Sequence, residues 1–271
     1  MANFIRAPRT GPRTGRLASS WWVERSDVAQ FQYEIADDVP DRFGTHVIEH
    51  LSDGGLLLLS GGHTILELLA PLRSSLAEYS GQPFAIGQVD ERLVPSDDDR
   101  SNWMHISTGL DALDYLQLPM ITCHTPTEKQ LLADCETPDS GVLEARTALA
   151  NGYAKRYEFL LAEYQPWSVV HLGLGTDGHT ASLFPDSLAL SNRSSLVTYN
   201  RDPSNANPLE RITLTFPALN RFQFRIVVAT GPDKAAVVER AIHGDGLPIH
   251  SLDPTNTLFL VDRDAAQGLT S

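Results

Sequence analysis

An aspartate and a histidine stand two residues apart in the stretch LGLGTDGHTASLFP, from Leu172 to Pro185. An imidazole has an ordinary pKa of about 6.5, so it can take a proton from water at neutral pH. A neighbouring carboxylate can fix which ring nitrogen carries the hydrogen. Because Gly178 frees the turn to aim both side chains inward, the stretch predicts His179 as a general base and Asp177 as its orienting partner. A histidine that only shapes the turn is the alternative.

Two other chemistries are less favoured at this stretch. Ser182 does not lie in a G-x-S-x-G elbow, so the sequence does not favour a serine nucleophile. A zinc site built from His63, His171 and His179 would lack any recognised ligand spacing, and His171 is expected to be a satisfied core residue. We therefore predict a site that holds no metal.

The histidine stretch directly follows an apolar run, and similar runs recur along the chain. Strand-like runs of apolar and β-branched residues occupy 56–60, 84–89, 168–175, 211–216, 224–230 and 257–262. Helical spacing of apolar residues occupies 38–51, 64–79, 102–116, 142–164 and 235–242, and a loop is expected over 125–140. Short buried strands that alternate with helices predict an α/β fold with a mostly parallel sheet covered on both faces.

Polar or glycine-rich residues follow four of the predicted strands. They are SGGHT at 60–64, DERLVP at 90–95, GLGTDGHTAS at 173–182 and GPDK at 231–234. In the third segment, Gly173 and Gly175 are expected to turn the chain with unusual dihedrals and to let a ligand approach the backbone. Because ligands of open parallel sheets bind beyond the carboxyl ends of the strands, the four segments predict one site at that edge.

The SGGHT segment, with Gly61 and Gly62, has the features of an anion site. At a junction from strand to helix, backbone N–H groups and the Thr64 hydroxyl can point at an anion on the positive end of the helix dipole. A tight turn with Thr64 as the N-cap is the alternative. The segment is neither a Walker loop nor a dinucleotide fingerprint, because it lacks the G-K-[ST] ending and the third glycine. For the DERLVP segment, a solvated loop with an internal ion pair is the alternative to a site.

The composition limits the partners of this chain of 271 residues. A formal net charge of −13 argues against a nucleic-acid binder, and a small anion would need a local basic pocket. No apolar run approaches the roughly 20 residues of a membrane span, and two cysteines fit a reducing compartment. We expect a cytoplasmic protein with an arginine-rich flexible tail over residues 1–25 and one domain over 26–271.

Five segments together resemble the 6-phosphogluconolactonase family: SGGHT, VDERLVPSDDDRSN, LGLGTDGHTASLFP, RITLTFPAL and GPDKAAVV, in this order and spacing. The resemblance extends from Leu56 to Ala266 and therefore covers most of the chain. It implies a Rossmann-like three-layer α/β sandwich similar to glucosamine-6-phosphate deaminase. It also implies hydrolysis of 6-phospho-D-glucono-1,5-lactone to 6-phospho-D-gluconate in the oxidative pentose phosphate pathway, with no cofactor.

The resemblance also assigns site residues. It places the substrate phosphate near the SGGHT turn with the cations of Arg211 and Lys234, and it leaves His179 at the lactone as the base. Residues on the sugar or phosphate side are Asp90, Arg92 and Asn102. Family turns usually read SGGSTP, so His63 and Ile65 depart from the pattern, and His63 becomes a further candidate for ligand contact.

Two other functions remain as alternatives. A deaminase or isomerase on the same fold has a histidine loop resembling DGHIAFNEP with a glutamate after it, whereas Leu183, Phe184 and Pro185 stand here. A noncatalytic sugar-phosphate sensor would keep Arg211 and Lys234 but would not need His179. With any of these functions we expect a small-molecule ligand, no nucleic acid or membrane partner, and a monomer or small homo-oligomer.

Overall fold

A parallel sheet of seven strands forms the centre of the computed structural model, which describes residues 31–51, 53–111, 113–133, 140–244 and 246–269. The strand order is β1-β10-β9-β6-β2-β3-β5, and every neighbouring pair is parallel. The strands are β1 (Gln32–Ile35), β2 (Gly55–Leu59), β3 (Phe84–Gln88), β5 (Leu116–Leu118), β6 (Trp167–Gly173), β9 (Phe224–Ala229) and β10 (Thr257–Val261).

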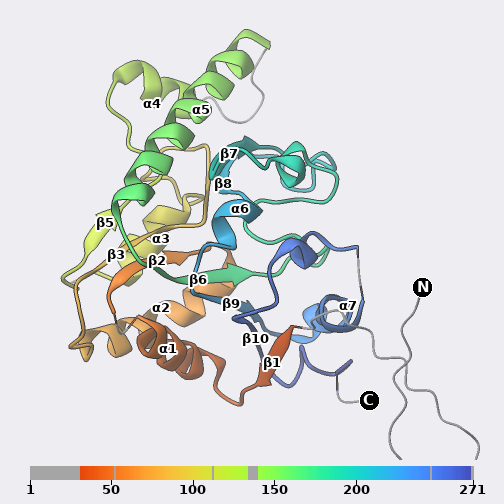
Figure 1. Cartoon of the computed structure of the whole chain (residues 1–271). Coiled ribbons are helices and arrows are strands. Elements are labelled where there is room, and N and C mark those ends of the chain that lie inside the picture. The colour runs from red at the N-terminus through yellow and green to blue at the C-terminus, as the bar shows by residue number, and fades with distance from the viewer. Residues whose placement is uncertain (1–30, 52, 112, 134–139, 245, 270–271) are drawn as a thin grey trace, which may run out of the picture.

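Helices cover both faces of this sheet (Figure 1). They are α1 (Val39–His50), α2 (His63–Ala77), α3 (Asn102–Gly109), α4 (Pro126–Ala133), α5 (Ser140–Glu163), α6 (Phe216–Leu219) and α7 (Ala235–His243). Successive side chains of β2 alternate between the faces: Leu57 and Leu59 join the core under α1, α2 and α3, whereas Leu56 and Leu58 join the core under α5 and α7. Each fully buried leucine contributes about 1.5–3 kcal/mol. The predicted three-layer α/β sandwich is confirmed.

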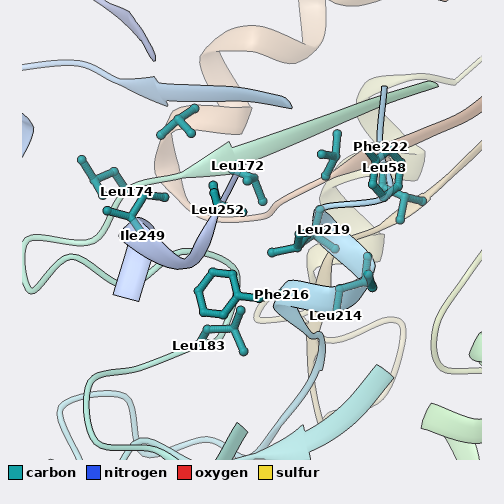
Figure 2. Close-up of a cluster of buried hydrophobic side chains, with 14 of the residues drawn as sticks. Leu58, Leu172, Leu174, Leu183, Leu214, Phe216, Leu219, Phe222, Ile249 and Leu252 are labelled. Atoms are coloured by element: carbon teal, nitrogen blue, oxygen red, sulfur yellow. The ribbon is translucent and has the colours of Figure 1, made fainter. Parts of the chain in front are cut away.

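A second group of buried side chains connects the central sheet to the segments around the histidine stretch (Figure 2). Leu172 and Leu174 come from the end of β6, Leu183 follows the histidine, and Phe216 belongs to α6. Ile249 comes from a short 3₁₀ helix, η3 (Pro248–Ser251). This packing connects the histidine loop to the core, in which Thr180 and Ser182 of the loop are also buried.

Two predicted segments form a smaller sheet of their own. The strands β4 (Asp90–Arg92), β8 (Arg211–Leu214) and β7 (Val197–Asn200) pair antiparallel in the order β4-β8-β7. The alternative of a solvated loop at DERLVP is therefore wrong for Asp90–Arg92, as is the placement of RITLTF in the parallel sheet. The pairing partners are far apart in sequence, so local patterns do not reveal them.

One helix prediction and one loop prediction were also wrong. The helix expected over 102–116 ends at Gly109, and Leu116–Leu118 instead pair with β3 as an edge strand. The loop expected over 125–140 contains α4, whose start carries a capping box: the Thr125 hydroxyl accepts from the Glu128 N–H, and the Glu128 carboxylate accepts from the Thr125 N–H. Pro126 at the first helical position suits the same start.

No helix in the described part of the chain is long and apolar enough to cross a bilayer. The tail predicted for residues 1–25 lies outside the described residues.

Candidate active site

A cavity of about 460 Å³ opens at the carboxyl ends of β2, β6 and β9, where they meet the smaller sheet. In the central sheet β2 and β6 are neighbours, and the chain continues from β2 to β3 on one side and from β6 to β9 on the other. The cavity therefore lies where the strand order reverses, which is the usual ligand position in such folds. The structure brings nine of the predicted site residues into its lining: Gly61, Gly62, Thr64, Asp90, Arg92, Asn102, His179, Arg211 and Lys234. Asp177 does not line the cavity.

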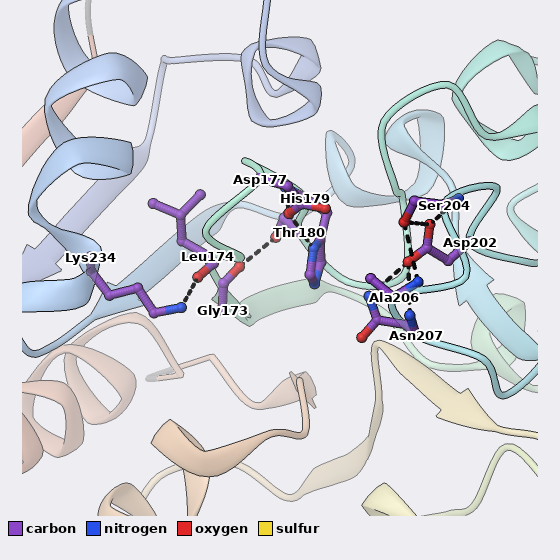
Figure 3. Close-up of polar contacts among 10 residues, drawn as sticks. All are labelled: Gly173, Leu174, Asp177, His179, Thr180, Asp202, Ser204, Ala206, Asn207 and Lys234. Carbon is purple, nitrogen blue, oxygen red and sulfur yellow. Dashed lines mark hydrogen bonds and ion pairs between the residues drawn. The ribbon is translucent and has the colours of Figure 1, made fainter.

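Asp177 lies behind His179 (Figure 3). Its Oδ1 is 2.6 Å from Nδ1 of the imidazole and also accepts the backbone N–H of His179 at 3.1 Å. Burial raises the pKa of Asp177, but the hydrogen bonds from His179 outweigh it and leave the pKa below its ordinary value. A carboxylate only accepts, so Nδ1 carries the hydrogen and Nε2 keeps its lone pair. Among the described residues Nε2 has no hydrogen-bond partner.

Glycines shape the loop that carries this pair: the turn freedom predicted for Gly178 is confirmed, whereas the unusual dihedrals predicted for Gly173 and Gly175 are not found. Neither Gly173 nor Gly175 has a left-handed backbone; that conformation occurs at Gly178, with φ of 84°. Gly175 is needed for space instead, because a Cβ there would lie 2.2 Å from Nδ1 of His179 and 2.7 Å from Oδ1 of Asp177. A Cβ on Gly173 would meet nothing within 4 Å, so its backbone is open to the cavity.

We expect Gly175→Ala to displace the His179 ring and to lower kcat by about 10²-fold, the typical cost of a misplacement of about 1 Å at a reacting group. The matched control is Gly152→Ala on α5, where a Cβ would meet nothing within 4 Å. Steady-state kinetics and melting temperatures of both variants check this expectation. Equal kcat values for Gly175→Ala and the wild type would contradict it.

Two arginines lie side by side in the smaller sheet. Arg92 on β4 is directly opposite Arg211 on β8 in the strand register. Each donates only to a carbonyl, Arg92 to that of Arg100 at 2.6 Å and Arg211 to that of Leu209 at 2.8 Å, and no salt bridge to a carboxylate is found for either among the described residues. Burial, and next the charge of Arg92, lower the pKa of Arg211 to about 10. Two adjacent guanidiniums without a paired anion are suited to a bound phosphate.

The remaining cation and the helix end lie elsewhere in the same cavity. Lys234 ends the 3₁₀ helix η2 (Pro232–Lys234), and its Nζ donates to the carbonyl of Leu174 at 2.9 Å, which holds it beside the histidine loop (Figure 3). Gly62, with φ of 95°, is the N-cap of α2 and offers no side-chain cap. The alternative for this turn, with Thr64 as the N-cap, is therefore wrong. The first N–H groups of α2 are left for a ligand.

Gly61 and Asn102 fit closely against each other. A Cβ on Gly61 would lie 1.8 Å from Oδ1 of Asn102. The side chain of Asn102 is 1% exposed, and its Nδ2 donates to the backbone carbonyl of Asp90 at 2.8 Å. Its Oδ1 is buried and has no partner among the described residues. An unpaired buried acceptor is costly, so a ligand hydroxyl that donates to Oδ1 would be favoured.

Glu91 organises this side of the cavity, and the sequence did not indicate it. Its buried carboxylate accepts from the backbone N–H of Arg92 at 2.7 Å, Asn102 at 2.7 Å and Trp103 at 2.9 Å, and from the Ser101 hydroxyl. Burial raises the pKa of Glu91 and these donors oppose that shift. The carboxylate thereby joins β4 to the start of α3. Apart from Arg92, the partners of Glu91 lie 10 to 12 residues further along the chain, so the residues next to Glu91 did not indicate them.

A second missed residue is Asn207, which lines the cavity from the loop between β7 and β8. Asp202 holds that loop: its carboxylate accepts from the N–H and side chain of Asn207, each at 2.9 Å, and from Ser204 (Figure 3). Burial opposes these hydrogen bonds, yet they lower the pKa of Asp202 to about 2. An Asp followed two residues later by Ser is a weak turn signal that could have located the loop but not its contact with the cavity.

Two further expectations concern buried polar side chains. His171 is in the core, but neither ring nitrogen has a partner among the described residues, so the expectation of a satisfied histidine is wrong. Burial lowers its pKa to about 3 and keeps it neutral. Ser182 lies on the cavity wall, where its hydroxyl donates to Asp90 at 2.6 Å. Asp90 accepts this hydrogen bond, and no histidine activates the serine, which agrees with the sequence.

The chain has relatives among known proteins. A family model described as glucosamine-6-phosphate isomerases/6-phosphogluconolactonase matches residues 34–260. A 6-phosphogluconolactonase from Homo sapiens is 36% identical over 222 residues, which cover 78% of this chain and 80% of the relative. Another from Mycobacterium tuberculosis is 34% identical over 227 residues, which cover 80% of this chain and 85% of that protein.

Solved structures share the fold. A 6-phosphogluconolactonase from Leishmania guyanensis superposes with a TM-score of 0.72 at 24% identity and covers 89% of this chain and 99% of its own. A monomeric glucosamine-6-phosphate deaminase superposes with a TM-score of 0.62 at 15% identity and covers 88% of this chain and 99% of its own. With the family match over 34–260, these similarities show that the chain belongs to the glucosamine-6-phosphate isomerase/6-phosphogluconolactonase family.

Proposed function

We propose that this protein hydrolyses 6-phospho-D-glucono-1,5-lactone to 6-phospho-D-gluconate, with His179 as the general base. The observation that carries the proposal is the meeting of two features in one cavity. In the described part of the chain, Nε2 of the His179 imidazole has no hydrogen-bond partner, and the pair of Arg92 and Arg211 has no salt bridge to a carboxylate. The first suits activation of water, and the second suits a phosphate. The relatives named 6-phosphogluconolactonase support the same substrate.

A lactone is an activated ester, so water can attack it without a covalent enzyme nucleophile. In the proposed reaction, Nε2 of His179 removes a proton as the water oxygen bonds to the carbonyl carbon. The imidazolium that forms is stabilised by Asp177 across the 2.6 Å contact. As the bond to the ring oxygen breaks, the same nitrogen returns the proton to that oxygen, so protons balance over the cycle. Backbone N–H groups of the glycine-rich loops are the donors we assign to the developing oxyanion.

The substrate phosphate is assigned to Arg211, Lys234 and the start of α2 at Gly62–Thr64. These groups form a local basic pocket in a chain of net charge −13, which is the condition an anionic ligand requires here. Arg92 and Asn102 are assigned to the sugar hydroxyls or the phosphate edge. The exposed His63 also lines the cavity, so it is close enough to contact a bound ligand.

The direct test generates the lactone with a glucose-6-phosphate dehydrogenase and follows its loss with and without the protein. We expect the loss to accelerate in proportion to protein concentration. Decay unchanged at every concentration would overturn the proposal. Glucosamine 6-phosphate is the matched second substrate: ammonia release from it would instead support the deaminase alternative, which the absence of a carboxylate at Leu183, Phe184 and Pro185 disfavours.

We expect the hydrolysis to need no metal. In the proposed mechanism proton transfer activates the water and backbone donors stabilise the oxyanion, and no ligand spacing for a metal occurs in the histidine loop. Exhaustive dialysis against a chelator should therefore leave kcat unchanged. A loss of kcat that one divalent ion restores would contradict this expectation.

The proposal also places the protein in the cytoplasm as a monomer or small homo-oligomer. Two cysteines in 271 residues support a reducing compartment. Light scattering of the purified protein measures its assembly, and microscopy of the native protein in cells tests its location.

A further inference from the structure

A cluster of histidine and glutamate side chains lies on the last turns of α1, outside the cavity. His46, Glu49 and His50 in the segment HVIEH are three and four residues apart, so they lie on one face of the helix. One possible ligand atom from each lies within 4.8 Å of the others. None of the three lines the active-site cavity. The same H-x-x-E-H spacing occurs in a class of zinc enzymes.

His46 has one ring nitrogen that nothing in the described structure uses. Its Nε2 is 3.0 Å from Oε2 of Glu34 on β1. Arg42 also donates to this carboxylate through Nε and Nη2, so the carboxylate serves as an acceptor for His46 as well. The hydrogen is therefore on Nε2, and Nδ1 keeps its lone pair. That Nδ1 is buried without a hydrogen-bond partner, in a side chain that is 9% exposed.

The unused nitrogen faces a carboxylate. Nδ1 of His46 is 3.7 Å from Oε2 of Glu49, too long for a hydrogen bond. A lone pair and a carboxylate repel each other unless a cation lies between them. The cation is either a second proton on His46 or a metal ion. The Glu34 contact resembles the carboxylate–histidine pairs that orient the ligands of metal sites.

His50 is oriented in the same manner. Its Nδ1 is 2.9 Å from the backbone carbonyl of His46, which can only accept, so Nδ1 carries the hydrogen and Nε2 is left as a possible ligand. The ring also stacks on Phe224 with centroids 3.6 Å apart and planes within 4° of parallel. Phe224 is the first residue of β9, so this contact lies at the opposite end of the strand from the cavity.

The local charge suits a cation. Arg42 lies on the same helix and is paired with Glu34 through Nε and Nη2. With neutral histidines, Glu34 and Glu49 outnumber Arg42 by one charge. A divalent ion would therefore meet a net negative environment in an acidic chain.

We propose that His46, Glu49 and His50 bind a divalent transition metal of the zinc type, with Glu34 orienting His46 and water completing the coordination. Imidazole and carboxylate donors suit zinc, cobalt and nickel ions. A tetrahedral ion with bonds of about 2.0–2.1 Å spaces its ligands about 3.3 Å apart, so the three atoms must approach each other slightly. Glu49 has a 55% exposed side chain, which leaves it free to make that adjustment toward the two histidines.

This site would lie at the end of α1, with Glu34 of β1 beside it, and would not take part in hydrolysis. A ligand that binds only the folded state stabilises that state, so zinc should raise the melting temperature of the protein while kcat stays unchanged. That separation keeps the metal proposal distinguishable from the proposed function: one is measured by binding and melting, and the other by turnover.

The test titrates Zn²⁺ into the untagged, chelator-treated full chain by calorimetry, with Co²⁺ absorption as a second probe of four-coordinate geometry. The variants are His50→Ala and Glu49→Gln, whose exposed side chains can be changed without opening the core. The matched control is His243→Ala, because His243 is the exposed last residue of α7 as His50 is of α1.

We expect one saturable site whose dissociation constant rises more than about tenfold in His50→Ala and Glu49→Gln and changes less than twofold in His243→Ala. Glu34→Gln should weaken binding by about 10–100-fold, the usual effect of losing a partner that orients a ligand. Zinc binding that is equal in the wild type and His50→Ala would overturn the proposal, since the ion would then be bound elsewhere, at Cys123 or the cavity histidines. Failure to bind zinc would also overturn it.

Discussion

The His179→Ala variant is expected to fold normally, bind 6-phosphogluconate like the wild type, and lose about 10²–10⁴-fold in kcat. His179 is held by a loop whose backbone bonds do not involve its ring: the Gly175 N–H donates to the carbonyl of residue 179, and the Gly178 N–H donates to that of Gly175. The ring is 25% exposed and contacts Phe184, so its removal costs little packing. The loss should therefore concern the chemical step alone.

The pH profile provides a second measurement of the same role. Protonation of a histidine base removes its lone pair, so kcat/KM of the wild type should fall as the pH is lowered into the range in which an imidazole base is protonated. The pKa of Asp177 lies below that of an ordinary carboxyl, so Asp177 remains ionised through this range and cannot produce the fall. The acid limb should be absent from the residual activity of His179→Ala.

Asp177→Asn is the matched variant. An asparagine keeps the shape but can present its amide nitrogen to Nδ1, which favours the wrong tautomer and leaves Nε2 protonated. We expect a large loss of kcat with the melting temperature nearly unchanged. A well-folded His179→Ala enzyme with near-normal kcat would remove the proposed base, and a lower melting temperature with normal turnover would indicate that the histidine only shapes the loop.

The central sheet could be predicted because its information is local. The runs at Leu56–Leu59 and Ile226–Ala229 are apolar on both faces, which is the pattern of a short strand buried on both faces. The edge strand Leu116–Leu118 carries no such signal: Leu116 is 48% exposed, and its strand exists because β3 offers backbone partners. The smaller sheet has the same origin, since Asp90–Arg92 become a strand only through pairing with Arg211–Leu214.

The candidate site divides in the same manner. Asp177 and His179 are two residues apart, so one short motif encodes both the pair and the glycine space around it. The lining by Asn207 depends on a loop held by Asp202, and the position of Asn102 depends on the buried Glu91. The contact of Glu91 with Asn102 connects β4 to α3, and the Asp202 loop reaches the cavity only once the sheets have assembled. The sequence could therefore predict the reacting group better than the residues that position the substrate.

Arg211→Met is expected to raise KM for the phosphorylated lactone by about ten- to a hundredfold, because a hydrogen bond to a charged group contributes about 1.5–3 kcal/mol. Methionine retains much of the side-chain volume and removes only the charge and the donors. KM for unphosphorylated gluconolactone should not change. The matched control is Arg193→Met, which removes an exposed arginine that donates to the carbonyls of its own turn.

Arg211→Met should not lose stability. This result would distinguish an arginine that binds the substrate phosphate from one that stabilises the fold. Burial and the neighbouring Arg92 lower the pKa of Arg211 to about 10, although Asp90, Glu91 and Asp202 oppose the shift. A base whose pKa is lower in the folded state than in the unfolded state destabilises the fold while it is charged. This loss of stability is fully present at neutral pH, because it disappears only as the pH rises above the folded-state pKa. Removing the charge should therefore leave the melting temperature of the free protein unchanged or higher. Phosphate should raise the melting temperature of the wild type more than that of the variant. Equal losses on both lactones, or a melting temperature well below that of Arg193→Met, would show that Arg211 supports the fold instead of the phosphate.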